Sequence, residues 1–340
     1  MNFRVGLTSD LSNGAGGFSW GDVSIQTLDP LNWEFMNNSG SVMSPTDVKG
    51  FDAIAFAGVG VNADSFGAPE DSPAVISRFG VGYDNIDLAA CTKAGVALTI
   101  TPDGSKKPVA TAALTLMLAT MFRLVAKDNQ ARSDDWANRI QGLGVGVNGK
   151  TIGTIGLGNV ASEFFRLLTP FDVKRIAFDP WKKIEEANAL GVELVDLQTL
   201  LAQCDVVLVT AALTPETLHM LSTAEFKTMK KSALLINVSR GPIVDEAALV
   251  TALQNGEIAG AGLDVFEVEP IAVDNPLMKM ANVILTPHNL AWTDELALGM
   301  GKSAFGSIKS ISRGEIPQFV VNRDVLETPQ FLNKLKRFQR

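Results

Sequence analysis

Six short apolar runs that alternate with helical patterns occupy the chain from residue 150 onward, and they constrain the fold more than any other feature. In order they are KTIGTIGLG, VKRIAFDP, CDVVLVTAA, SALLINVSRG, IAGAGLDVF and NVILTPH. Strands that are apolar on both faces belong in a parallel sheet that helices cover on both sides. The sequence therefore predicts an α/β fold built on a doubly wound parallel sheet.

The first hundred residues repeat this pattern less regularly. The runs FRVGLTS, DAIAFAG and GVALTIT are typical of strands, and each is followed by turn or helix signals. A chain of 340 residues has room for about two domains. We therefore expect two similar α/β units with a border near residue 101, before the helix that contains Val109. A helical stretch from about Thr293 could return to the first unit, and periodicity alone leaves this open.

Charge and cysteine usage exclude several classes of protein. The net charge of −8 argues against a surface that binds nucleic acid or anionic membranes. Cys91 and Cys204 are far apart and form neither a disulfide framework nor a cluster of metal ligands, which indicates a reducing compartment. We expect no metal site.

No segment has the pattern of a targeting or membrane-spanning sequence. The N-terminal MNFRVGLTSD lacks the apolar core of a signal peptide. The most apolar long run, from Val109 to Phe122, is shorter than a spanning helix. We expect a cytoplasmic protein in which this run is a buried or interface helix.

The run TIGTIGLGNVASEFFRLL contains a dinucleotide-binding pattern. Gly156, Gly158 and Ala161 form G-x-G-x-x-A directly after a strand and at the start of an amphipathic helix. The first glycine permits a tight turn, the second lets a pyrophosphate approach the backbone, and the small third residue lets helix and strand pack closely. Phosphate oxygens would lie near the amides of Asn159 and Val160 at the helix N-terminus.

An acidic residue indicates which dinucleotide is bound. The next strand ends in Asp179, where a carboxylate can bond both ribose hydroxyls of NAD and would repel the 2′-phosphate of NADP. A tight turn with a surface acid is the alternative interpretation, and the strand, the glycines and the acid together favour NAD. Lys182 and Lys183 follow closely and leave NADP open.

Three later strands each end in polar residues. The first of these strands is followed by Arg240, the second by Asp264, Glu267 and Glu269, and the third by His288. Ligands of an open parallel sheet bind at the carboxyl ends of its strands, so these groups should meet in one crevice. Carbonyl reduction suits them: an arginine can clamp a carboxylate and polarise the neighbouring carbonyl, and a histidine held by a carboxylate can donate a proton.

Each of these residues also has a structural interpretation. Arg240 could cap a helix or pair with Asp245, His288 could be a turn residue, and at least one of Glu267 and Glu269 is expected to be a solvated loop acid. The arrangement of all of them at strand ends behind a dinucleotide motif favours the functional interpretation.

These motifs resemble the D-isomer-specific 2-hydroxyacid dehydrogenases, which reduce 2-keto acids with a nicotinamide cofactor. The resemblance lies in LLINVSRGPIVDEAALVTALQNGEIAGAGLDVFEVEPI, NVILTPH, RFGVGYDNIDLAACTKAGVALTITP and LTPETLHMLSTAEFKTMKKSALLIN. It implies a catalytic set of Arg240, Glu269 and His288, and it selects Glu269, the acid before Pro270, over Glu267.

The resemblance also implies an architecture of two Rossmann-like domains. A cofactor domain of residues 102–290 would be inserted into a smaller catalytic domain made of residues 1–101 and 291–340. Backbone amides of Gly80, Val81 and Gly82 should help to hold the substrate carboxylate. The nicotinamide end of NAD should be lined by Val238, Ser239, Arg240, Asp264 and His288. The family is commonly dimeric through the helix after the TP motif, so we expect a homodimer.

The chain departs from the family pattern at several places. Thr111 stands where the family usually has an acid after VA, and Asn289 to Trp292 replace the usual small residues after the histidine. Because that loop borders the substrate in the family, the substrate could be bulkier or differently polar. The glycine-rich N-terminal SDLSNGAGGFSWGD could also shape the pocket. His219 has no carboxylate in its motif and is interpreted as structural.

The sequence is compatible with two classes of function. The first is an NAD-dependent reductase of 2-keto acids, with phosphoglycerate and hydroxypyruvate enzymes as special cases; formate dehydrogenases use glutamine where this chain has Glu269. The second is an NAD-sensing protein of the corepressor type, since a fold and its motifs do not prove turnover.

Overall fold

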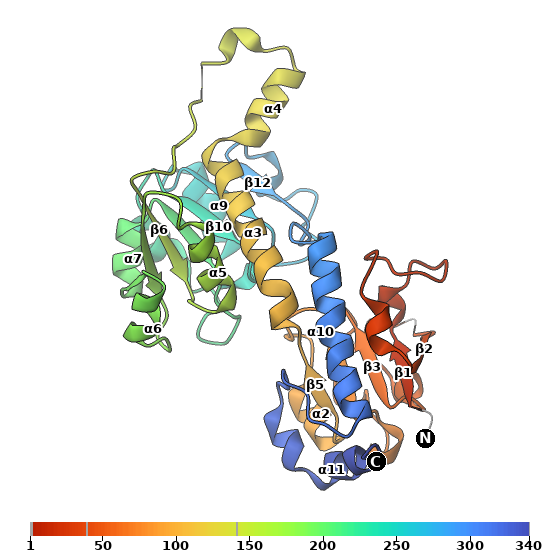
Figure 1. Ribbon diagram of the computed structural model, residues 1–340. Coiled ribbons are helices and arrows are strands. Elements are labelled where there is room, and N and C mark those ends of the chain that lie inside the picture. Colours follow the sequence, from red (N-terminus) through yellow and green to blue (C-terminus); the bar gives the residue numbers. More distant parts are fainter. Residues whose placement is uncertain (1–2, 39, 141, 340) are drawn as a thin grey trace. The chain divides into compact units, whose positions relative to one another are not determined.

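The chain folds into two compact units. The computed structural model describes residues 3–38, 40–140 and 142–339 (Figure 1). The first unit runs to Ser105 and resumes at Trp292, and the second is continuous from Lys106 to Ala291. The two parallel sheets with flanking helices confirm the predicted α/β class and its two doubly wound units.

The borders of these units differ slightly from the predicted 101/102 and 290/291. Helix α3 (Pro102–Met121) begins in the first unit because its first turn packs against α10 (Asp294–Ser312). A Cβ on Gly104 would lie 2.3 Å from the carbonyl carbon of Gly299, so the two backbones are in contact. The hydroxyl of Ser303 donates to Asp103 over 2.6 Å. The roles expected of the two domains stay predictions.

The second unit contains a seven-stranded parallel sheet. Its spatial order is β12-β11-β10-β9-β6-β7-β8, so the direction of winding reverses beside β6. The strands are β6 (Lys150–Ile155), β7 (Val173–Phe178), β8 (Glu193–Leu194), β9 (Val206–Val209), β10 (Leu234–Asn237), β11 (Gly260–Leu263) and β12 (Val283–Leu285). All pairings are parallel.

Helices cover both faces of this sheet. α3 and α5 pack on one face, and α7, α8 and α9 on the other. Along β9, Val206 and Leu208 pack in the hydrophobic cluster with α3 and α5, and Val207 packs in the cluster with α7, α8 and α9. Because both faces of the strand are buried, it is apolar throughout. The helices are α4 (Leu124–Arg132), α5 (Asn159–Leu167), α6 (Ile184–Ala189), α7 (Leu197–Gln203), α8 (Thr223–Thr228) and α9 (Glu246–Gln254), with short 3-10 helices η4 (Trp136–Asn138), η5 (Gly241–Ile243) and η6 (Pro276–Lys279).

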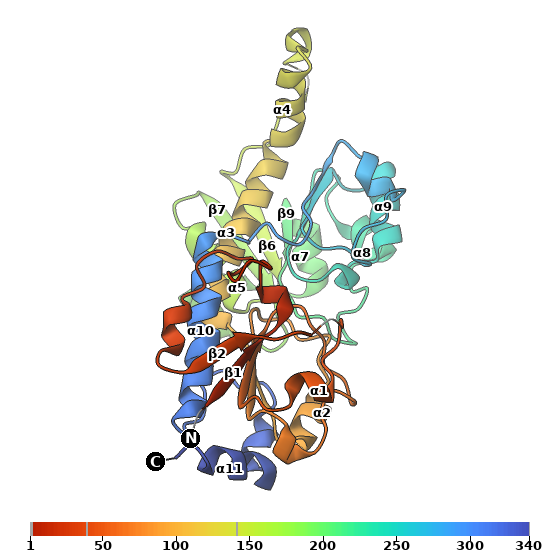
Figure 2. The ribbon, with the colours of Figure 1, turned by 90° about the vertical axis from the view of Figure 1, so that its right-hand side faces the viewer.

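The apolar run from Val109 to Phe122 forms most of α3 and is largely buried within the second unit. Ala110, Ala113 and Met117 belong to the hydrophobic cluster beneath the sheet. α4 and the loop after it project from this unit (Figures 1 and 2). Within the described residues no single helix passes as a membrane span on length and hydropathy; only α3 and α4 taken together do, across a 58° bend.

The first unit contains a smaller parallel sheet, in the order β2-β1-β3-β4-β5. Its strands are β1 (Arg4–Leu7), β2 (Asn32–Phe35), β3 (Ala53–Phe56), β4 (Val75–Arg78) and β5 (Ala97–Thr99). Figure 2 shows α10 on one side of this sheet and α1 (Pro45–Val48) and α2 (Leu88–Lys93) on the other. Short 3-10 helices are η1 (Ser9–Leu11), η2 (Ile25–Leu28), η3 (Pro69–Asp71) and η7 (Arg323–Glu327).

The C-terminal segment completes the first unit. α10 packs against β3 and β4, and the side chain of Asn322 accepts from Leu98 N and donates to Val96 O. In α11 (Pro329–Lys336), the buried ammonium of Lys334 donates to three carbonyls at the ends of neighbouring loops, those of Pro73, Ala94 and Gly95. The helical stretch from Thr293 therefore does return to the first unit.

Candidate active site

The glycine-rich loop connects β6 to α5. Gly156 has φ +92°, and a Cβ there would lie 2.8 Å from Ala211 N, so only glycine fits. A Cβ on Gly158 would meet nothing within 4 Å, and Gly158 caps α5 without a side-chain bond. The first amides of the helix, those of Asn159 and Val160, have no intrahelical partner. The space and the donors fit a dinucleotide pyrophosphate.

Asp179, at the end of β7, is tied to this loop. Its Oδ2 accepts from Leu157 N over 2.7 Å, and its Oδ1 accepts from Trp181 N over 2.9 Å. Lys182 forms an ion pair with Glu186 at 3.2 Å. The carboxylate is therefore fixed beside the glycine turn, where the sequence predicts the ribose of the adenosine half.

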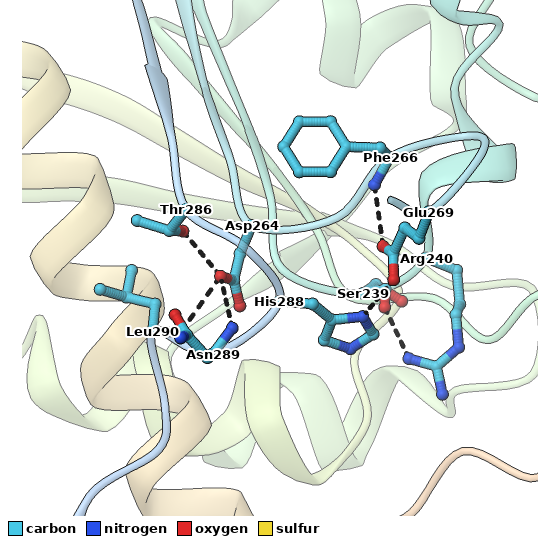
Figure 3. A network of polar contacts seen from close by, with 9 residues as sticks. All are labelled: Ser239, Arg240, Asp264, Phe266, Glu269, Thr286, His288, Asn289 and Leu290. Atoms are coloured by element: carbon cyan, nitrogen blue, oxygen red, sulfur yellow. Dashed lines mark hydrogen bonds and ion pairs between the residues drawn. The ribbon is translucent and has the colours of Figure 1, made fainter. Parts of the chain in front are cut away.

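His288 and Glu269 form a close pair. His288, three residues beyond β12, has φ +53°, and its Nδ1 lies 2.8 Å from Oε2 of Glu269 (Figure 3). The other glutamate oxygen accepts from Phe266 N over 3.0 Å. Both side chains are partly exposed, at 46% and 36%. The carboxylate thus fixes the imidazole ring and leaves its Nε2 on the other edge.

Arg240 follows β10 on a braced turn. The side chain of Asn237 accepts from Ser239 N and donates to Arg240 O, both over 3.0 Å. The Ser239 hydroxyl donates to Ala211 O, and Arg240 Nη1 donates to Ser239 O over 2.7 Å. The carboxylate of Asp245, offered above as a surface partner for Arg240, caps α9 by accepting from Ala248 N and also accepts from the hydroxyl of Ser222.

Asp264 lies buried behind His288, with 6% of its surface exposed. Its Oδ1 accepts from the Thr286 hydroxyl over 2.6 Å and from the amides of Asn289 and Leu290 over 3.2 Å each (Figure 3). Burial raises the pKa of Asp264 above its usual range, and these donors oppose that shift. The carboxylate therefore fixes the chain on both sides of His288.

The four groups come from one edge of one sheet. Because β10, β11 and β12 are parallel neighbours, their carboxyl ends bring Arg240, Asp264, Glu269 and His288 together, as Figure 3 shows. Asn237 and Thr286, whose side chains hydrogen-bond to this set, were not predicted from the sequence. Both were visible as polar residues at or just beyond strand ends.

His219 has a carboxylate partner that its local motif does not reveal. Its Nε2 lies 2.8 Å from Glu267 Oε1, and the other oxygen of Glu267 accepts from Glu246 N over 3.0 Å. The backbone amide of His219 donates to Pro242 O over 2.8 Å. The pair therefore links the loops after β9, β10 and β11, and Glu267 is not merely a solvated acid.

The loop from Gly80 to Gly82 follows β4 in the first unit. The Gly80 amide donates to the Thr101 hydroxyl over 2.9 Å, and Thr101 N donates to Gly80 O over 3.0 Å. Among the described residues, no acceptor lies within hydrogen-bonding reach of the Val81 and Gly82 amides. Of the three predicted amides, these two remain available to a ligand.

Comparison with known proteins decides the family. The D-isomer specific 2-hydroxyacid dehydrogenase NAD-binding domain matches residues 114–289. A glyoxylate reductase of Thermococcus litoralis is 40% identical over 258 residues, covering 74% of this chain and 78% of that protein. The chain belongs to the D-isomer specific 2-hydroxyacid dehydrogenase family.

Two further proteins are similar to this dehydrogenase. A D-3-phosphoglycerate dehydrogenase of Archaeoglobus fulgidus is 38% identical over 257 residues, covering 76% of this chain and 49% of that protein. The crystal structure of an NADPH-dependent glyoxylate/hydroxypyruvate reductase from Sinorhizobium meliloti, in complex with NADP and malonate, has a TM-score of 0.78 and 28% identity over 95% of this chain and 98% of that one.

Family membership settles the general chemistry. The dehydrogenase is an oxidoreductase with an NAD-binding domain, and it interconverts 2-keto and 2-hydroxy acids. The interpretation as an NAD-sensing protein without turnover is not favoured. Among residues 3–38, 40–140 and 142–339, no group of three or more His, Cys, Asp or Glu is arranged to hold a metal ion.

Proposed function

We propose that the enzyme works mainly as an NADH-dependent reductase of 2-keto acids, forming D-2-hydroxy acids, with His288 and Glu269 as its acid–base pair and Arg240 as its substrate-binding cation. The observation that carries the proposal is the 2.8 Å contact between His288 Nδ1 and Glu269 Oε2 at the sheet edge that also bears Arg240.

The residues divide the reaction between them. When bound, the cofactor supplies the hydride that is added to C2 of the keto acid. His288 donates its Nε2 proton to the C2 oxygen, and Glu269 stabilises the protonated imidazole before transfer. The planar guanidinium of Arg240 binds the substrate carboxylate and polarises the adjacent carbonyl. One hydride and one proton thus convert the ketone to the alcohol.

Further contacts are assigned to substrate and cofactor. We assign the available amides of Val81 and Gly82, in the first unit, to the substrate carboxylate. In the second unit we assign Asp264, Val238 and Ser239 to the nicotinamide end of the cofactor. Because Oδ1 of Asp264 already accepts three donors, its Oδ2 is the acceptor left for a carboxamide N–H.

NAD is the preferred dinucleotide in this proposal. In this proposal the loop of Gly156, Gly158, Asn159 and Val160 binds the pyrophosphate of the dinucleotide. Asp179 lies beside this loop as a fixed negative charge. That charge would repel a 2′-phosphate. Lys182 is already paired with Glu186, which weakens the case for a phosphate site there.

We also propose a homodimer formed through the projecting arm, residues 122–145. Its α4 contains no buried residue, and large apolar side chains along the arm are exposed: Phe122, Leu124, Val125, Trp136, Ile140, Leu143 and Val145. A hollow at the base of the arm is lined by further apolar residues, including Met121, Met280 and Ile284. Exposed apolar surface of this extent is typical of an interface.

The test is oxidation of NADH, with NADPH in parallel, against glyoxylate, hydroxypyruvate, pyruvate, phenylpyruvate, 2-ketoisocaproate, oxaloacetate and 3-phosphohydroxypyruvate. We expect His288→Ala to abolish turnover and Glu269→Gln to lower kcat roughly a hundredfold. Arg240→Ala should mainly raise KM and also lower kcat. Tight NADH binding without reduction of any acid would reject the proposal.

A further inference from the structure

A second imidazole–carboxylate pair lies close to the proposed acid–base pair in the chain, and the proposed mechanism does not use it. Glu267, whose carboxylate lies 2.8 Å from His219 Nε2, precedes Glu269 by two residues. His219 and His288 are the two histidines of the chain, and each has a positive φ, +50° and +53°. Residues other than glycine seldom adopt this conformation, so surrounding contacts must hold it.

Glu267 and Glu246, the first residue of α9, are hydrogen-bonded to each other in both directions. Glu246 N donates to Oε2 of Glu267 over 3.0 Å, and Glu267 N donates to Oε2 of Glu246 over 3.2 Å. This exchange brings two carboxylates to the same pair of backbone segments, where their negative charges repel each other. Asn275 donates to the outer oxygen of Glu246 over 2.6 Å, and His219 Nε2 is the donor to that of Glu267, since a carboxylate only accepts. The imidazole therefore completes this network.

The network fixes the segment that carries Glu269. Phe266 N donates to Oε1 of Glu269 over 3.0 Å, as Figure 3 shows, and the next amide, that of Glu267, is held by Glu246. The proposed acid–base contact requires that the backbone from Phe266 to Glu269 keeps this course. The bonds of Glu267 to Glu246 and to the imidazole hold the start of that segment.

The same histidine holds the loop after β10. His219 N donates to Pro242 O over 2.8 Å. Gly241 lies directly against Phe266, because a Cβ on Gly241 would be 1.8 Å from Phe266 O. His219 thus contacts the loop after β10, which begins with Arg240, through its backbone, and the loop after β11 through its side chain. All of these residues belong to the second unit.

We propose that His219 is a positioning residue for the reduction of the keto acid. Its bonds to Glu267 and Pro242 fix the loops after β11 and β10. The fixed loops keep Glu269 against His288. This inference rests on the proposed function, in which that pair transfers the proton, and it assigns His219 no contact with substrate or cofactor.

Two amide variants separate positioning from a general structural role. Asparagine tolerates a left-handed backbone, and in His219→Asn the amide ends nearer the backbone than Nε2 of histidine, too short to reach Glu267. The side chain of His219→Gln is one methylene longer and can offer an N–H donor to the same carboxylate. Both variants remove the imidazole, so a difference between them reports the hydrogen bond.

The first readout is the titration of His288, followed by NMR in the full-length enzyme. Since the chain contains two histidines, either variant leaves one imidazole Cε1–H signal, that of His288. Glu269 favours the protonated ring, so its displacement in His219→Asn should move the titration to lower pH by about half a unit to one unit. His219→Gln should stay close to the wild type.

Electrostatics alone predicts the opposite sign. Loss of a positive charge at position 219 would favour protonation of His288 and move its titration to higher pH. The other charged groups that face the two rings are the same in both variants: Asp245 and Glu267 at position 219, and Asp264, Glu269 and Arg240 around His288. The direction of the shift therefore distinguishes positioning from the loss of charge.

Turnover gives a second readout. His219→Asn should lower kcat roughly tenfold and change the Kd for NADH less than twofold, because the glycine-rich loop is untouched. His219→Gln should recover most of kcat. Glu193→Gln removes an exposed carboxylate paired with Lys174 on β8, at the opposite edge of the same sheet from β12, and should change neither kcat nor the titration of His288.

The inference is overturned if the titration of His288 is unchanged or higher in His219→Asn, if the Asn and Gln variants behave alike, or if kcat is unchanged. Should circular dichroism show that His219→Asn is unfolded, Glu267→Asp withdraws the carboxylate from the same imidazole and must lower the titration in its place. The NMR measurement requires no substrate. Failure of the inference is therefore seen there, whereas failure of the proposed function is seen as a wild type that reduces no acid.

Discussion

At the scale of single residues, the site combines predictable positions with unpredictable partners. Arg240, Glu269 and His288 could be located from the sequence because each directly follows an apolar strand, and parallel strands end at one edge. The pairing of His219 with Glu267 could not, because they are 48 positions apart and α8, β10, α9 and β11 lie between them.

Asp264 makes folding stability depend on pH in a defined direction. Because burial raises its pKa above the ordinary value of 3.8, the folded protein holds this proton more tightly than the unfolded chain. This group alone therefore causes stability to fall as pH rises from that ordinary value through the raised one. Asp264→Asn keeps an acceptor oxygen for Thr286, Asn289 and Leu290 but removes the ionisation.

The free energy of unfolding of Asp264→Asn minus that of the wild type should therefore increase as pH rises from 4 to 7. Urea denaturation at several pH values measures this difference, in which titration of all other groups cancels. A difference that stays constant with pH, or that worsens, would contradict the assignment. Thr286→Val, which removes one donor and keeps the carboxylate, serves as the comparison.

At the scale of elements, burial decides what could be predicted. The strands β6, β7 and β9 to β12 were predicted because regularly spaced apolar runs mark them. β2 was missed since Asn32, Trp33 and Glu34 are exposed at the sheet edge, and β8 has only two residues. β4 was missed because its short apolar run merges into the glycine-rich loop that follows. The exact border between the two units near residue 102 depends on contacts of the first turn of α3 with α10, which the local sequence does not reveal.

Two glycines in α10 should respond oppositely to the same substitution. A Cβ on Gly301 would lie 1.9 Å from Val23 O, whereas one on Gly306 would meet nothing within 4 Å. Gly301→Ala should destabilise the protein by about 1–3 kcal/mol through overpacking, and Gly306→Ala should stabilise it by about 0.5–1 kcal/mol through helix propensity. Urea unfolding followed by circular dichroism measures both. Changes of the same sign would contradict the described difference in packing around Gly301 and Gly306.

At the scale of the whole molecule, the proposed association and the two-unit architecture can each be tested independently of activity. The arm presents its apolar side chains without a partner in the single chain, and the two cysteines fall one in each unit. These features allow assembly and unfolding to be followed separately, with readouts that do not require the substrate to be known.

The arm should hold two chains together. We expect light scattering after gel filtration to give about twice the 36.2 kDa of one chain. Ile140 and Leu143 are 79% and 84% exposed, and the double substitution Ile140→Asp, Leu143→Asp should produce monomers. Val273→Asp, at a site 89% exposed outside the arm, is the matched control and should leave the mass unchanged. A monomeric wild type would refute the proposed dimer.

The two thiols should be unreactive in the folded protein. Burial raises the pKa of Cys91 and of Cys204 to about 12, so little thiolate forms at pH 8 and reagent cannot reach either sulfur. We expect labelling by a chromogenic disulfide to be at least a hundredfold slower than in urea. Cys91→Ser and Cys204→Ser variants then report the opening of one unit each. Rapid labelling of either native thiol would show that its unit opens readily.

The discontinuity of the first unit has a consequence for how the protein is made. Its sheet depends on partners that are translated after the second unit: α10 against β3 and β4, Asn322 against the backbone of β5, and Lys334 against three loop carbonyls. The second unit, continuous from Lys106 to Ala291, needs no such late arrival. During synthesis the middle of the chain should therefore fold first, while the segment translated before it waits for the segment translated after it.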